Sequence, residues 1–194
     1  MAKPGERKLQ ILQSLAGMLE SPQAEKITTA ALAARLSVSE AALYRHFASK
    51  AQMYEGLIEF IETSLFGLIK RISMEETAGI EQARAVVQVL LVFADKNRGM
   101  CRVLTGEVLV NENPRLQARV NQLLDRIEVS LKQSLRIAAS QGLLAEGVDA
   151  GMAANLLLAF VQGRWQQFVK SGFVRVPMEN WAGQWALVVR ALSA

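Results

Sequence analysis

Apolar residues recur every three or four positions along most of the chain, the spacing that gathers them on one face of an α-helix. One such segment begins at Met53 and continues through Leu57, Ile61, Leu65, Leu68 and Ile72. Ser49 and Gln52 precede it in the arrangement of a capping box, in which side chains bind free backbone amides at a helix start. A second segment begins at Asn113-Pro114 and is expected to extend to about Ala139. Both segments are predicted to be long amphipathic helices.

Three further segments complete the pattern. Residues 80–94 are apolar on all sides, so this helix is expected to lie at the centre of a helical body. Residues 152–169 are again periodic, and Pro177 is expected to open a last helix that carries Trp181 and Trp185. No segment alternates apolar and polar residues with a period of two between turn signals. The predicted fold class is therefore all-α.

The segment from Ile27 to Lys50 reads ITTAALAARLSVSEAALYRHFASK and predicts two short helices joined by a tight turn. Thr28 or Thr29 is expected to cap the first helix and Ser39 the second. The second helix is expected to end near Phe47 and to pack against the first through its apolar side. Two short helices joined in this way describe a helix-turn-helix, whose second helix enters the major groove of DNA.

The outward face of this second helix suits contact with DNA. It carries small, polar and cationic residues: Ser39, Glu40, Ala41, Tyr44, Arg45 and His46. Ser39 and Ala41 are small enough to let the start of the helix approach base edges closely. Tyr44, His46 and Lys50 stand at positions suited to phosphate oxygens, which fix the protein on the duplex.

Positive charge is concentrated in the same part of the chain. Residues 1–54 hold seven basic and four acidic side chains, whereas the remaining 140 residues hold 15 and 14. A basic segment joined to a nearly neutral body is typical of a nucleic-acid-binding module attached to another domain. On charge alone, an ordinary solvated surface is an equal alternative. The predicted division is a DNA-binding domain at residues 1–52 and a second helical domain at residues 53–194.

The composition argues against catalysis and metal binding. His46 is the only histidine and Cys101 the only cysteine, so a Cys/His zinc site and an intramolecular disulfide lack partners, and a nucleophile–histidine pair would have to use His46, which is expected on the DNA-facing helix. We therefore expect no enzyme, no metal and no cofactor, with Cys101 as a buried small hydrophobe. The sequence shows neither an apolar run of about 20 residues, the length needed to span a membrane, nor a signal peptide. A cytoplasmic location is expected.

The stretch SVSEAALYRHFASK closely resembles the signature of the TetR/AcrR family, in which a small-residue turn, an LYxHF core and a following lysine recur. The resemblance implies an N-terminal helix-turn-helix domain followed by a C-terminal helical bundle for dimerisation and regulation. It implies DNA contacts from residues of both short helices and from the lysine beyond them: Thr28, Thr29, Ser39, Glu40, Ala41, Tyr44, Arg45, His46 and Lys50.

Stretches outside this signature resemble the branch of the family that acts in nucleoid occlusion. They read ILQSLAGMLES, LIEFIE, RVLTGEVL and RLQARVNQLLDRIE. Members of this branch bind palindromic chromosomal sites as dimers and, while bound to DNA, engage the division protein FtsZ and antagonise its rings over the nucleoid. The resemblance therefore implies double-stranded DNA, FtsZ and a second copy of the chain as partners, and a location on the nucleoid.

The FtsZ contacts that the resemblance implies fall on Phe60 in LIEFIE and on Lys96 and Asn97 in FADKNRG. Lys96 stands where the family has an arginine, which keeps the charge but not the planar fork of a guanidinium. Leu68 stands where the family has a basic residue, with Lys70 and Arg71 close by in the sequence. Core packing is the competing interpretation of Phe60, which lies at the edge of an apolar stripe.

The dimer interface is expected on the last two long helices. All three tryptophans lie there, and aromatic anchors are enriched in subunit interfaces. Gly163 would allow close approach of the partner. The expected interface residues are Leu156, Phe160, Trp165, Trp181 and Trp185.

A ligand-responsive transcriptional repressor of the same family is the competing function. Such a repressor needs an apolar cavity with a few convergent polar groups in its C-terminal domain. The inner positions of the candidate helices are mostly Leu, Val, Ala and Ile, which predicts a packed body without a small-molecule ligand. The operator sequence and the number of dimers on one site are left open.

Overall fold

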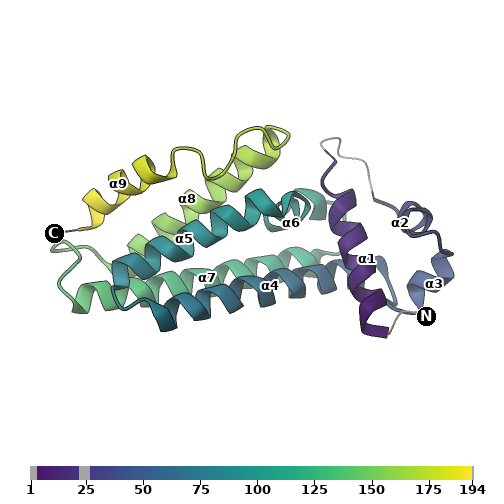
Figure 1. The fold of residues 1–194 in the computed structure, drawn as a ribbon, viewed down its shortest axis with the longest axis horizontal. Coiled ribbons are helices and arrows are strands. Elements are labelled where there is room, and N and C mark those ends of the chain that lie inside the picture. The colour runs from purple at the N-terminus through teal and green to yellow at the C-terminus, as the bar shows by residue number, and fades with distance from the viewer. Residues whose placement is uncertain (1–3, 22–26, 194) are drawn as a thin grey trace. The chain divides into compact units, whose positions relative to one another are not determined.

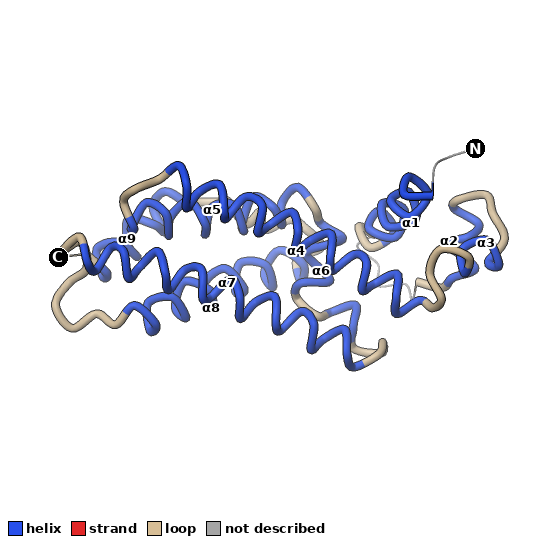
Figure 2. The backbone as a smooth tube through the Cα atoms, turned by 90° about the horizontal axis from the view of Figure 1, so that it is seen from below, coloured by secondary structure: helices blue, strands red, loops and turns tan. Residues whose placement is uncertain are grey.

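The computed structural model describes residues 4–21 and 27–193, and within these ranges every regular element is a helix (Figures 1 and 2). The all-α prediction is confirmed. The elements follow in the order α1 (Pro4–Met18), α2 (Thr29–Arg35), α3 (Glu40–Tyr44), α4 (Lys50–Glu75), α5 (Gly79–Lys96), α6 (Arg98–Leu104), the short 3-10 helix η1 (Glu107–Leu109), α7 (Pro114–Ser140), α8 (Ala150–Lys170) and α9 (Trp181–Leu192). None of the described helices is long and apolar enough to cross a membrane.

The chain forms two compact units, and each is assembled from segments that are distant in the sequence. The first, called the HTH unit, comprises residues 1–61 and 97–120. The second, called the bundle unit, comprises residues 62–96 and 121–194. The beginnings of α4 and α7 thus belong to the HTH unit and their remainders to the bundle unit. The segment that contains α6 and η1 also belongs to the HTH unit, although the sequence pattern does not assign it to the DNA-binding domain.

In the HTH unit, α6 packs closely against α1. Gly99 of α6 lies so near the backbone carbonyl of Ala16 that a Cβ atom at position 99 would overlap it. The large, fully buried side chains of the unit include residues of α1, α2, α3 and α4: Ile11, Leu15, Leu32, Leu43, Met53, Tyr54 and Leu57. The helix-turn-helix therefore packs on a hydrophobic core, and α6 covers one side of this core.

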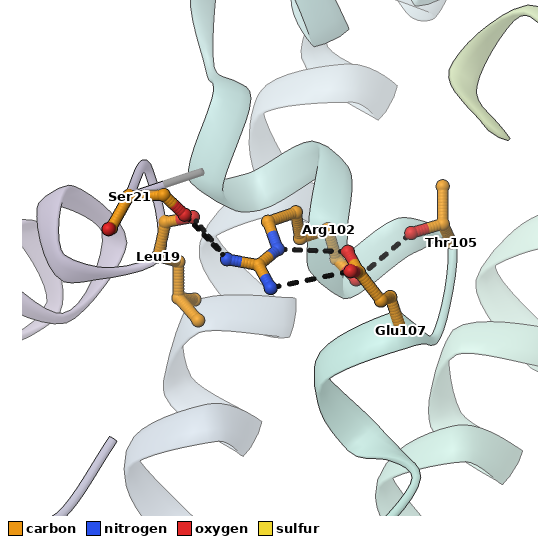
Figure 3. A network of polar contacts seen from close by, with 5 residues as sticks. All are labelled: Leu19, Ser21, Arg102, Thr105 and Glu107. Carbon is orange, nitrogen blue, oxygen red and sulfur yellow. Dashed lines mark hydrogen bonds and ion pairs between the residues drawn. The ribbon is translucent and has the colours of Figure 1, made fainter. Parts of the chain in front are cut away.

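Arg102 of α6 fastens the end of α1 (Figure 3). Its Nη1 donates to the carbonyl oxygens of Leu19 at 3.2 Å and Ser21 at 3.0 Å, just beyond the last turn of α1. Its Nε and Nη2 donate to the carboxylate of Glu107 at 2.9 and 3.4 Å. The guanidinium and Leu19 are buried, so these bonds replace the water that the charge and the Leu19 carbonyl have lost. Removing Arg102 would leave those carbonyls without their partner.

In the bundle unit, α5 and α8 pack side by side, as Figure 1 shows. Trp165 of α8 is fully buried between them, and its Nε1 donates to the carbonyl oxygen of Leu90 at 3.1 Å. Trp165 is therefore a core residue of the protomer and offers no side-chain surface to a partner, which corrects its expected place in the dimer interface. Asp149 caps α8 by accepting hydrogen bonds from the amides of Met152 and Gly151, and these bonds lower the pKa of its carboxyl group.

Two further expectations are corrected in the bundle unit. The helix α5 is not enclosed on all sides, because Val89 is half-buried and Val92 is exposed on one face that ends at the exposed Lys96. The last helix begins at Trp181 and not at Pro177. Residues 177–180 form turns instead, and the guanidinium of Arg164 donates hydrogen bonds to the carbonyl oxygens of Val176, Pro177 and Glu179 in this segment.

Candidate nucleic-acid interface

The turn between α2 and α3 is closed by backbone hydrogen bonds. The amide of Ser37 donates to Ala34 and that of Val38 to Ala33, both at 3.0 Å, which is the Schellman pattern of a helix end. Ser37 has a φ of +53°, in the left-handed region where glycine is usual. Thr28 caps α2 through the amide of Ala31, and Ser39 caps α3 through that of Ala42, so both predicted caps are confirmed.

The helix α3 presents the predicted outward face. Ser39, Glu40, Ala41, Tyr44 and Arg45 are exposed and His46 is half-buried, whereas Leu43 and Phe47 are buried beneath them. The helix ends at Tyr44, about one turn before the expected end near Phe47. Beyond Tyr44 the amides of His46 and Phe47 both donate to the carbonyl of Leu43, which closes one further turn, and Ser49 then caps α4 through the amide of Gln52.

Three of the predicted DNA-contacting side chains are joined to one another. The hydroxyl of Thr29 donates to the carboxylate of Glu40 at 2.5 Å, and the hydroxyl of Tyr44 donates to Thr29 Oγ1 at 3.4 Å. Thr29 opens α2, whereas Glu40 and Tyr44 are the first and last residues of α3. The two helices are thus linked on the exposed face by a polar chain, which sequence spacing did not indicate.

Lys50 is held by a residue that sequence reasoning missed. Its ammonium forms an ion pair with Glu112, which lies 62 positions further on, between η1 and α7. The same ammonium lies 5.7 Å from the centre of the Tyr54 ring. Burial, with Glu112 nearby, raises the pKa of Tyr54 to about 12, so its hydroxyl stays neutral at physiological pH. No local pattern could have identified Glu112, because the pairing depends on how α6, η1 and α7 fold back.

The described residues include no group of three or more His, Cys, Asp or Glu side chains that could hold a metal ion. Cys101 is buried in α6, and burial raises the pKa of its thiol to about 12. At neutral pH it is therefore a protonated, enclosed group and a poor nucleophile. His46 lies two residues beyond the end of α3, in the helix-turn-helix.

The residues expected to contact FtsZ lie on α4 and at the junction of α5 and α6. Phe60 of α4 belongs to the HTH unit and is 39% exposed, so it is not a core side chain. Lys96 is the exposed last residue of α5, and the half-buried Asn97 precedes α6.

The expected dimer residues divide into buried and exposed groups. Trp181 and Trp185 are buried within the bundle unit, their ring centroids are 5.4 Å apart, and the half-buried Phe160 lies 6.2 Å from Trp181. Leu156 is 55% exposed. It shares an exposed stripe on α8 with Met152, Ala159 and Gly163.

Comparison with known proteins agrees with this arrangement. The family model of bacterial regulatory proteins, tetR family, matches residues 24–57. The SlmA-like model described as tetracyclin repressor-like, C-terminal domain, matches residues 78–193. Among solved structures, a TetR transcriptional regulator from Chloroflexus aurantiacus J-10-FL is similar with a TM-score of 0.80 and 18% identity, with all of both chains covered. FadR from Bacillus subtilis, in complex with stearoyl-CoA, gives a TM-score of 0.77 at 16% identity and covers 94% of this chain and 98% of that one. These structures show the fold.

The fold and this interface define a TetR-type DNA-binding protein, with a helix-turn-helix followed by a helical C-terminal domain. The nucleoid occlusion factor SlmA of Marinomonas sp. (strain MWYL1) is 48% identical over 190 residues, which cover 98% of this chain and 96% of that protein. SlmA of Idiomarina loihiensis is 48% identical over 186 residues, covering 96% and 95%. The chain belongs to the SlmA family of nucleoid occlusion factors.

Proposed function

We propose that this protein is a nucleoid occlusion factor: it binds palindromic chromosomal sites as a homodimer and, on DNA, binds FtsZ and antagonises ring assembly over the nucleoid. The observation that carries the proposal is the 48% identity to nucleoid occlusion factors over nearly the full chain, extending far beyond the helix-turn-helix. A pull-down of FtsZ with and without operator DNA tests it, and retention of FtsZ only on the DNA-bound protein is the expected result.

The exposed apolar surface of α8 and α9 supports a dimer. Met152, Leu156, Ala159 and Gly163 follow one face of α8, and Leu187 of α9 is 67% exposed. Added Cβ atoms at Gly163 and at Gly183 of α9 would meet nothing within 4 Å, so a second copy could approach closely at both points. Two-fold symmetry would then present two recognition helices to successive major-groove turns, which requires a palindromic site.

Leu156→Glu is expected to weaken the dimer about 100-fold. Each copy in a two-fold interface loses one buried apolar contact, and each contact contributes on the order of 1.4 kcal/mol to the binding free energy. Analytical ultracentrifugation across a concentration series measures the change. Val129→Glu is the matched control, since Val129 is a similarly exposed apolar residue on α7. Equal dimer dissociation constants for wild type and Leu156→Glu would remove α8 from the interface.

Lys50 is proposed to contact a backbone phosphate on DNA. Lys50→Ala is expected to weaken binding to all sequences and to lower the slope of log K against log salt by about 0.9 per recognition helix, because one fewer counterion is released. Tyr44→Phe is the comparison, since it removes a neutral hydrogen bond and should leave the slope unchanged. Fluorescence anisotropy over a salt series gives both slopes. An unchanged slope for Lys50→Ala would show that Glu112 keeps the ammonium away from phosphate.

The exposed stripe of α5 supports an FtsZ-facing role for Lys96. Val89, Val92 and Lys96 lie one helical turn apart in succession, so an apolar strip ends in a cation. A peptide segment with apolar and acidic residues would complement such a strip. Phe60 and Asn97 are proposed as further contacts.

A cavity in the bundle unit favours a second candidate function, the ligand-responsive repressor. Its volume is about 510 Å³, and its lining combines apolar side chains of α4, α5 and α7, such as Ile69, Val86 and Ile137, with polar groups, including Gln82 and Ser134. This size lies within the range of small-molecule sites. A small apolar ligand that released the protein from operator DNA would favour this alternative.

A further inference from the structure

Glu40 is an acidic side chain on the face that is proposed to meet DNA. It is exposed at the first position of α3, where its neighbours on the same face are neutral or basic. A carboxylate that approaches a duplex is repelled by phosphates and loses water, so its presence on this face lowers affinity for DNA in general. Such a cost is offset only where the carboxylate accepts a hydrogen bond from the DNA itself.

The carboxylate of Glu40 is held in place. Thr29 Oγ1 donates to Glu40 Oε2, and Tyr44 in turn donates to Thr29. One carboxylate oxygen is thus engaged within the protein, while the other has no bond to Thr29. A carboxylate has about four acceptor positions, so acceptor capacity remains after these contacts are made.

We propose that Glu40 is a specificity-determining residue that accepts a hydrogen bond from the exocyclic amino group of a cytosine in the major groove, with Thr29 and Tyr44 as its positioning residues. This inference rests on the proposed sequence-specific binding of DNA. Cytosine N4 is the major-groove donor that glutamate and aspartate typically read. Guanine and thymine present acceptors at the corresponding place, so their oxygens would face the carboxylate and be rejected.

The experiment is a selection of duplexes from a random library by the full-length protein, carried out with wild type, Glu40→Gln and Glu20→Gln. Glu20 is an exposed carboxylate in the same unit, so Glu20→Gln removes the same charge away from the recognition helix. Wild type should enrich a palindrome with cytosine at one fixed position of each half-site. Glu40→Gln should lose that preference at least tenfold, with adenine gaining, because glutamine pairs with adenine N6 and N7.

Thr29→Val and Thr29→Ser test the positioning role. Valine removes the hydroxyl that links Glu40 to Tyr44, and it should reduce the cytosine preference at that position while leaving the other base frequencies unchanged. Serine keeps the hydroxyl and should restore the preference. A merely structural role for Thr29 would reduce affinity for every duplex equally, without changing base frequencies.

The outcomes separate this inference from the proposed function. Identical base frequencies for wild type and Glu40→Gln, or the same change in Glu20→Gln, would overturn the role of Glu40 while leaving sequence-specific binding intact. Failure of the wild type to enrich any common sequence would instead contradict the proposed function. Affinity for a random-sequence duplex should rise about threefold or more in Glu40→Gln, since one repulsive charge near the phosphates is removed.

Discussion

Replacing Arg102 by methionine should lower the free energy of unfolding by about 2 kcal/mol, because the buried carbonyl of Leu19 is left without its hydrogen-bond donor. Methionine has a similar length but no donors. The carbonyls of Leu19 and Ser21 would lose their partner, and Glu107 would lose its counter-charge. For a chain of this size the melting temperature is expected to fall by roughly 4–8 °C. Differential scanning calorimetry or a urea titration measures the loss.

The matched control is Arg84→Met. Arg84 pairs with Glu81 one turn away on α5, but both side chains are 42% exposed. An exposed pair of this kind contributes about 0.5 kcal/mol or less. If the two variants lost the same small amount of stability, Arg102 would not fasten α1 to α6 in solution.

Lys96→Glu should reduce FtsZ binding at least tenfold while leaving affinity for operator DNA within about twofold of wild type. Reversal of the charge removes the attraction for an acidic segment of FtsZ and adds repulsion. Charged groups at an interface largely determine which partner binds. DNA binding should persist because Lys96 belongs to α5, outside the helix-turn-helix. Two titrations measure the change, one with labelled operator and one with FtsZ in the presence of operator.

Lys170→Glu is the control for this separation of activities. Lys170, like Lys96, is an exposed lysine in the last turn of its helix, so both reversals carry the same cost against the helix dipole. Lys170→Glu should retain both activities. Unchanged FtsZ binding by Lys96→Glu would remove Lys96 from the interface, and loss of both activities would indicate damage to the fold.

Features that depend on neighbouring residues could be predicted from the sequence. Thr28, Ser39 and Ser49 cap the helices that their positions indicate, because a cap needs only a hydroxyl and an amide two or three residues away. The outward face of α3 followed from helical spacing alone, although α3 proved a turn shorter than expected. The predicted division between residues 52 and 53 stays a prediction.

Features that depend on distant residues could not be predicted. Trp165 looked like an interface anchor because it is aromatic and near the end of the chain, yet its indole binds a backbone carbonyl of α5 in the core. The pairing of Lys50 with Glu112 and of Arg102 with the end of α1 joins segments more than 60 positions apart. Only the folded chain brings these partners together.

The most direct test of the proposed function follows FtsZ polymers in the presence of this protein. Purified FtsZ is assembled with GTP and sedimented with the protein alone, with the protein and its selected operator duplex, and with the protein and a scrambled duplex of equal length. The expected result is a marked loss of sedimented FtsZ with the operator and little loss with the other two mixtures. Equal amounts of FtsZ polymer in all three mixtures would contradict a DNA-dependent action on cell division and would favour the ligand-responsive repressor.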